Sequence, residues 1–210
     1  MHIPDGFLDA KTWATLGAVS AAAVGTAAVY ARRSLEDRDI PLMGVMSAFI
    51  FAAQMLNFPV AGGTSGHFLG GALAAILLGP ARGFLVMTAI LIVQAFLFGD
   101  GGVTALGANV FNMGVIGAVG AYLIYRAARR ILGGGAIGVP AFIAAWASVV
   151  LAALACSLEL AASGTVPLGT VIPAMVGIHA IIGVGEGLIT VGALALVRRA
   201  RPELLGVSAG

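Results

Sequence analysis

The sequence predicts an all-α membrane protein, a bundle of about seven transmembrane helices with the N-terminus outside and the C-terminus in the cytoplasm. Of its 210 residues, 60% are hydrophobic and only 10% are charged. The mean hydropathy is +1.06, a value that excludes a water-soluble domain of this length. Apolar runs recur at close to the roughly 20 residues that a helix needs to cross a bilayer. We therefore expect one integral-membrane domain over residues 1–210.

Seven apolar runs form the expected spans, and polar or glycine-rich segments separate them. Arg32–Asp39 is the longest polar stretch and divides the first run from the second. The third and fourth runs are short, so we expect them to be tilted, partly re-entrant, or one helical hairpin broken at Gly79–Gly83. The spans are placed at 12–31, 40–57, 67–79, 83–98, 106–126, 136–162 and 171–197, with an outer segment at 1–11 and a cytoplasmic tail at 198–210.

The basic residues determine the expected orientation of these spans. The chain has 11 Lys and Arg residues, and Lys11 alone falls on the outer side when the N-terminus is outside. An excess of Lys and Arg in cytoplasmic loops is the usual signature of inside loops, and an even number of spans would spoil this pattern. The inner residues are Arg32, Arg33, Arg38, Arg82, Arg126, Arg129, Arg130, Arg198, Arg199 and Arg201.

Small residues line two of the expected spans at helical spacing. Ala14, Ala18 and Ala22 lie four residues apart in the first span, and Gly114 and Ala118 do so in the fifth. Such residues let helices approach closely. They fit packing within one bundle or a docking face for another membrane subunit, and their spacing does not separate the two.

The outer segment begins Met1-His2-Ile3-Pro4-Asp5 and offers three nitrogen donors to a metal. These are the α-amine of Met1, the backbone nitrogen of His2 after loss of its proton, and an imidazole nitrogen of His2. They favour a planar, all-nitrogen site, which suits Ni²⁺, Cu²⁺ or Co²⁺ better than tetrahedral Zn²⁺. Pro4 stiffens the chain directly after the chelate. A chance histidine near a frayed terminus is the alternative.

A second histidine is expected on the same side, in the glycine-rich stretch Gly62–Gly71. His67 can supply the fourth nitrogen of a square plane, since the glycines allow a loop to approach the inserted terminus. The alternative is a histidine that caps a helix in a flexible loop. Thr64 and Ser65, with Asp5 of the outer segment, are candidates for hydrogen bonds that support the ligands.

Three amide side chains and two ionisable residues complete the polar inventory of the spans. Gln94, Asn109 and Asn112 are expected either to anchor the N-terminal segment or to bond one another. His179 and Glu186 share one face of the last span, two helical turns apart, and structural hydrogen bonding is the first interpretation for both. Glu159 is expected at the membrane interface, and Cys156 as an inert buried residue.

No motif in the chain supplies an energy source or a reaction. The sequence contains no G-x-x-x-x-G-K-[ST] phosphate loop and no paired intramembrane carboxylates with basic partners. Its three histidines, one cysteine and scattered hydroxyls show no spacing typical of a nucleophile with its base. We therefore expect neither an enzyme nor a catalytic cofactor.

Four blocks of sequence, in order, carry a family resemblance: MHIPDGFL, GTSGHFLGG, LFGDGGVTALGANVFNMG and HAIIGVGEGLIT. Together they resemble the NikM/CbiM membrane subunit, the substrate-capture (S) component of energy-coupling-factor (ECF-type) ABC importers for nickel or cobalt. The resemblance covers nearly the whole chain. It implies a seven-helix bundle in the inner (plasma) membrane of a prokaryote, with the N-terminal segment tucked in from outside and a square-planar Ni²⁺ or Co²⁺ substrate on Met1, His2 and His67.

The resemblance also implies partners, and other functions stay open beside it. The partners are a transmembrane coupling protein (T component), a pair of cytoplasmic ATPases that hydrolyse ATP, and a small accessory membrane subunit expected as a separate chain. No nucleic acid is expected. Nickel is the first expectation and cobalt, for cobalamin biosynthesis, the alternative. A stand-alone channel or secondary transporter and a membrane sensor with an incidental chelate are the remaining alternatives.

Overall fold

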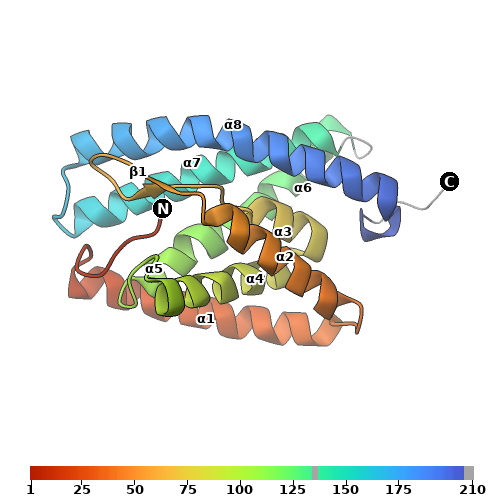
Figure 1. Cartoon of the computed structure of the whole chain (residues 1–210), viewed down its shortest axis with the longest axis horizontal. Helices are drawn as coiled ribbons and strands as arrows, with labels where there is room; N and C mark the ends of the chain where they lie inside the picture. Colours follow the sequence, from red (N-terminus) through yellow and green to blue (C-terminus); the bar gives the residue numbers. More distant parts are fainter. Residues whose placement is uncertain (134–136, 206–210) are drawn as a thin grey trace.

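A computed structural model describes residues 1–133 and 137–205 as a bundle of helices lying roughly along one axis (Figure 1). Two short strands, β1 (Phe58–Pro59) and β2 (Ser65–Gly66), pair antiparallel and interrupt the helices. The helices are α1 (Ala10–Ser34), α2 (Asp39–Gln54), α3 (Gly71–Leu78), α4 (Pro80–Val93), α5 (Leu106–Val110), α6 (Ala121–Leu132), α7 (Gly138–Ala162) and α8 (Leu168–Ala200), with π-helical segments η1 (Gln94–Phe98) and η2 (Phe111–Gly120) and a 3₁₀ turn η3 (Pro202–Leu205).

The expected all-α membrane bundle is confirmed. Within residues 1–133 and 137–205, five helical segments are long and apolar enough to cross a membrane: Ala10–Ser34, Pro80–Phe98, Leu106–Leu132, Gly138–Ala162 and Leu168–Ala200. α2 is a shorter apolar helix of 16 residues. With the short α3, the helical segments follow the seven expected spans, and most ends shift by a few residues. Residue 136, the first of the expected sixth span, and residues 206–210 of the expected tail lie outside the described residues.

The third expected span, 67–79, differs most from the structure. Its helix α3 has only 8 residues, too few to cross a bilayer. Residues 67–70 are not helical and lead from the β1–β2 ribbon into the bundle. Gly79, with φ +83°, then reverses the chain, and α4 begins at Pro80. α3 and α4 therefore form a broken hairpin whose first helix is short, because residues 67–70 are not helical and instead lead the chain into the bundle.

The α3–α4 hairpin is packed too closely for any side chain at Gly83. A Cβ there would lie 2.7 Å from the backbone of Ala75. This close approach places α3 against α4 in the centre of the molecule, where Ala72, Ala74 and Ala75 are fully buried. Small residues here serve packing within the bundle.

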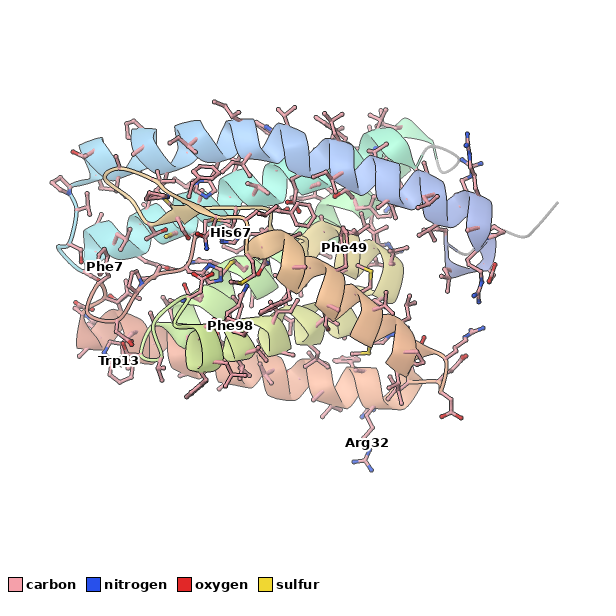
Figure 2. All side chains as sticks on the ribbon, viewed as in Figure 1. Phe7, Trp13, Arg32, Phe49, His67 and Phe98 are labelled. Carbon is pink, nitrogen blue, oxygen red and sulfur yellow. The ribbon has the colours of Figure 1, made fainter. Side chains whose placement is uncertain are left out.

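The first three residues lie inside the bundle (Figure 1), where Met1 and Ile3 are completely buried. Phe7 and Trp13 lie at one end of the molecule, and Arg32 lies at the other (Figure 2). α1 therefore runs from one end of the bundle to the other, and the orientation with its start outside stays a prediction from the basic residues. The protein is a multi-pass membrane protein whose first residues extend from the start of α1 toward the centre of the bundle.

Candidate metal centre

The α-amine of Met1 is buried against the β2 strand. It donates to the backbone oxygen of Ser65 and, at 2.9 Å, to the Ser65 hydroxyl. The same hydroxyl oxygen accepts from the His2 backbone N–H at 3.2 Å. Two of the three nitrogens of the predicted chelate therefore converge on one oxygen. Burial lowers the pKa of the Met1 amine to about 5, so that the amine carries a free lone pair at neutral pH.

Residues 3–5 fix the depth at which the terminus is inserted. Asn109 acts on both polar groups of Ile3: its Oδ1 accepts from the Ile3 N–H at 2.8 Å, and its Nδ2 donates to the Ile3 carbonyl at 3.1 Å. The Gly102 N–H donates to the same carbonyl at 2.8 Å. The carboxylate of Asp5 accepts from the backbone N–H groups of Val103 and Thr104 at 3.1 and 2.7 Å. The segment is thus bonded along its length to the loop before α5.

A chain of amide side chains orients the imidazole of His2. Leu69 supplies a backbone carbonyl, which can only accept, and the Gln54 Nε2 donates to it at 2.6 Å. The Gln54 Oε1 therefore accepts from the Gln94 Nε2 at 2.9 Å, and the Gln94 Oε1 faces the His2 Nε2 at 3.0 Å. Since each amide has one donor end and one acceptor end, the His2 Nε2 must carry the proton. The Nδ1 lone pair of His2 is left free, on the side of its own backbone nitrogen.

His67 is held by the same kind of bond, but through its other nitrogen. Its Nδ1 lies 2.7 Å from the Phe68 carbonyl, an acceptor, so Nδ1 carries the proton and Nε2 is bare. The rings of His2 and His67 stack with their centroids 4.6 Å apart. Among the described residues, neither His2 Nδ1 nor His67 Nε2 has a hydrogen-bond partner. Two buried imidazole lone pairs without a partner are what a metal ligand set requires.

The chemistry of these donors explains why side chains alone do not define the site. In the described part of the chain, no three His, Cys, Asp or Glu side chains gather as a metal cluster. The donors are instead one amine, one backbone nitrogen and two imidazoles. Burial also lowers the pKa of His2, to about 3, so a proton does not compete for its lone pair at neutral pH. Four nitrogen donors fit a borderline d⁸ or d⁷ ion better than Mg²⁺ or Ca²⁺.

Other predicted supporting residues fall into two groups. Ser65, Gln94, Asn109 and Asp5 contact the N-terminal segment, as described above. Thr64 lies apart, with its hydroxyl 4.0 Å from the sulfur atoms of Cys156 and Met175. Asn112 also lies apart, because its Nδ2 donates to Glu159 at 2.7 Å.

The structure bears on two expectations for the sixth span. Glu159 lies near the outer end of α7, where its depth at the membrane interface stays a prediction, and it is buried because its carboxylate accepts from the Asn112 amide at 2.7 Å. Cys156, one turn earlier on α7, is a fully buried free cysteine, in line with the expected buried residue.

Glu186 and His179 have different roles although they share a face of α8. The Glu186 carboxylate accepts from the backbone N–H groups of Leu69 and Gly70 at 2.7 and 2.8 Å. It thereby fixes the main chain two and three residues after His67. His179 lies beside the site but directs its Nδ1 to the Met175 carbonyl one turn back, at 2.7 Å. Glu186 is a positioning residue for the loop that carries His67.

Sequence reasoning overlooked two residues at this site. Gln54 is a fully buried amide in an apolar helix, and a polar residue inside a span is a functional candidate by default, so this signal was present. Asp100 lies in a glycine-flanked loop, with its Oδ1 3.3 Å from the His2 Nδ1. Its position beside His2 depends on the docking of the N-terminal segment, which the sequence alone does not give.

Comparison with known proteins places this chain among metal transporters. The family model for the cobalt uptake substrate-specific transmembrane region, CbiM, matches residues 2–204. A protein of Haloquadratum walsbyi named as a metal transport protein is 47% identical, with 98% of this chain and 93% of that protein aligned. The cobalt transport protein CbiM of Sorangium cellulosum is 36% identical over 98% of this chain and 94% of its own length.

A fused relative and a solved structure agree with this placement. A fused nickel transport protein NikMN of Archaeoglobus fulgidus is 43% identical, with 98% of this chain and 68% of the fused protein aligned. The crystal structure of a truncated transition metal transporter superposes with a TM-score of 0.90 at 36% identity, covering 95% of this chain and 99% of that chain.

Proposed function

Because the chain belongs to the CbiM family of cobalt uptake substrate-specific transmembrane regions, and is thus a nickel or cobalt transport component of the membrane, we propose that it captures the ion on four nitrogen atoms. These are the Met1 α-amine, the His2 backbone nitrogen, the His2 Nδ1 and the His67 Nε2. The whole chain, residues 1–210, forms one substrate-capture domain. Residues 1–11 are the chelating segment, 12–197 the bundle and 198–210 the cytoplasmic tail.

One observation carries this proposal: the hydrogen bonds of the two histidines use opposite ring nitrogens and leave one lone pair bare on each. In His2 the bare atom is Nδ1, which can close a six-membered chelate ring with the backbone nitrogen of the same residue. The amine of Met1 closes a second ring through that nitrogen. A metal ligand whose other nitrogen is fixed by a hydrogen bond is a preorganised one.

Binding through the His2 backbone nitrogen requires that its proton leave. The Ser65 hydroxyl oxygen lies 3.2 Å from this nitrogen and accepts its hydrogen bond. Metal affinity that depends on deprotonation of a ligand rises with pH. We expect capture to weaken as the medium becomes acidic.

The donor set favours nickel over cobalt. Planar nitrogen coordination suits the d⁸ ion Ni²⁺, and the stability order of divalent ions also places Ni²⁺ above Co²⁺. Cu²⁺ would bind more strongly still, so metal supply and access contribute to selection. Cobalt is the second candidate, because the matching family model and one aligned relative carry cobalt in their names.

Transport requires more than this chain. We propose that it acts as the S component of an ECF-type ABC importer, with a transmembrane coupling protein, two cytoplasmic ATPases and a small accessory membrane subunit. The chain has no phosphate-binding loop with which to hydrolyse ATP. A stand-alone channel would instead take up nickel in cells that lack the ATPases.

The decisive experiment measures bound nickel by plasma mass spectrometry on protein tagged only at the C-terminus. The native start is compared with a form carrying three extra glycines before Met1 and with His67→Ala. We expect one nickel per chain in the native protein and loss of stoichiometric nickel in both variants. Equal nickel in the extended and native proteins would overturn ligation by the Met1 amine. Thermal unfolding of each variant in detergent shows that loss of metal is not loss of fold.

A further inference from the structure

We propose that a cavity beside His2 is the entrance of the metal site, and that Asp100 in its wall is the first protein ligand of the incoming hydrated cation. This inference rests on the proposed function and adds the path by which the ion reaches the site. The cavity has a volume of about 350 Å³ and is lined by the N-terminal segment, the β1–β2 ribbon and the turn at residues 99–101. His2, Ser65, Asn57 and Asp100 are among its lining residues.

The cavity connects an accessible carboxylate with an inaccessible imidazole. The side chain of Asp100 is 18% exposed, whereas that of His2 is 2% exposed. The Asp100 Oδ1 lies 3.3 Å from the His2 Nδ1. A cation that arrives from outside therefore meets Asp100 before it can reach the imidazole.

The contact between Asp100 and His2 does not satisfy either atom. The amide chain through Gln94 leaves the His2 Nδ1 without a proton, so a lone pair faces a carboxylate oxygen and no hydrogen lies between them. The other carboxylate oxygen is anchored, because the Asn57 Nδ2 donates to it at 3.2 Å. Asp100 thus presents one free oxygen, next to a buried and unpartnered nitrogen.

The separation of these two atoms suits one shared ion. Metal–ligand distances of about 2.0–2.2 Å place two donors at right angles roughly 3 Å apart. The 3.3 Å between Asp100 Oδ1 and His2 Nδ1 is close to this value. An ion held by Asp100 can therefore bind the His2 Nδ1 before it leaves the carboxylate.

The cavity is also large enough for the ion with its water. Six waters occupy about 180 Å³ at roughly 30 Å³ each, and the cavity holds about 350 Å³. A carboxylate oxygen is a harder ligand than imidazole and suits a cation that still carries most of its hydration shell. The remaining waters are then replaced by nitrogen donors, and Asp100 has no place in the final all-nitrogen plane.

The turn that carries Asp100 is fixed relative to the site. The Asp100 N–H donates to the Gln94 carbonyl at 3.0 Å, and Gln94 is the residue that orients His2. Gly101, with φ +94°, passes so close to the site that a Cβ there would lie 3.0 Å from the Asn109 amide nitrogen and 3.3 Å from the His2 ring. The carboxylate is therefore held at the edge of the His2 ring and not on a free loop.

The test is the kinetics of nickel loading in Asp100→Asn, followed by stopped-flow absorbance of the square-planar nickel complex. An entry ligand that is absent from the final site speeds association and dissociation alike. We expect both rate constants to fall about tenfold or more, while the dissociation constant and the visible spectrum stay within a few-fold of native. Unchanged rates would overturn the proposal. A changed spectrum, or a dissociation constant raised in step with a faster dissociation, would make Asp100 a permanent ligand and would overturn it equally.

A matched control separates a local ligand from general attraction by negative charge. Asp9→Asn removes one negative charge from the outer segment that begins with the chelate, and it keeps a good cap on α1, where Asp9 accepts from the Thr12 N–H at 2.7 Å. We expect native loading rates in this variant. The effect of Asp100→Asn must also persist near 1 M salt, where charges are screened beyond about 3 Å. Equal slowing in both variants, or loss of the effect in salt, would overturn the local role.

The same measurements distinguish failure of this inference from failure of the proposed function. Absence of stoichiometric nickel in the native protein would remove the capture site and the entrance with it. Native loading that depends on His67 but not on Asp100 would remove the entrance alone.

Discussion

Removal of the Glu186 carboxylate is predicted to loosen the metal site from a distance. Its two oxygens accept the backbone N–H groups of Leu69 and Gly70 at 2.7 and 2.8 Å, and the side chain is 1% exposed. Glu186→Ala would leave two buried donors unpaired, at a cost of about 1–3 kcal/mol each, or about 2–6 kcal/mol in total. Glu186→Gln keeps one acceptor oxygen and should cost about half as much.

The free energy of unfolding, measured by chemical denaturation in detergent micelles, tests this magnitude. Nickel affinity is measured on the same variants and should fall, because His67 precedes the two anchored peptides by two and three residues. Thr190→Val is the matched control: Thr190 is buried one turn further along α8, and its hydroxyl has no hydrogen-bond partner among the described residues. If Glu186→Ala matched this control in stability and bound nickel as the native protein does, the positioning role would be wrong.

The remaining predictions concern the other supports of the site. Gln54→Leu interrupts the amide chain to His2 and should weaken nickel binding by about 10- to 100-fold, as loss of a bond that orients a ligand does in other metal sites; competition with a chelator of known affinity measures this. Nickel affinity should fall as pH drops from about 8 to 5. Burial lowers the pKa of the Met1 amine from 8.0 to about 5, so in this pH range an undocked terminus takes up a proton and the docked one does not. Calorimetric titrations at several pH values measure this change in affinity. Asp5→Ala removes the acceptor of the Val103 and Thr104 N–H groups and should speed hydrogen exchange in residues 2–8 several-fold, as followed by mass spectrometry.

Each of these predictions has a result that contradicts it. Native affinity in Gln54→Leu would mean that the amide chain does not set the His2 tautomer. Affinity that is constant between pH 5 and 8 would exclude both the neutral docked amine and ligation by the His2 backbone nitrogen. Unchanged exchange in Asp5→Ala would show that Asn109 alone holds the segment.

The apolar runs predicted most of the helices but not the depth of the loops between them. Helices α1, α4, α7 and α8 lie where the hydropathy of the sequence places them, because a span is a local property of about 20 residues. The third span was expected to start at His67, yet its helix starts at Gly71. Residues 67–70 are apolar enough to resemble a helix, but in the structure they are not helical, and their backbone groups bond to Glu186 and Gln54 instead.

The candidate site was predictable where its donors are encoded in short motifs. Met1, His2 and His67 were selected from such motifs, and the structure brings these residues together. Gln54 was overlooked although a polar residue in a span is itself a signal. The partners of Gln54 and Asn112 were not predictable, because packing across the whole bundle decides which face of an apolar helix turns toward which neighbour. An amide in a uniformly apolar helix gives no local sign of its partner.

The backbone of Leu69 connects three helical segments with both histidines. Its carbonyl ends the chain of amides from η1 and α2 to the ring of His2, and its N–H donates to the Glu186 carboxylate of α8. The positions of the two imidazole rings therefore depend on one residue of the main chain, two positions after His67. A shift of α8 against α2 would displace Leu69 and would thereby change the positions of both the His2 and the His67 rings. At the proposed site, we therefore expect a change in helix packing to disturb both imidazole donors and not one alone.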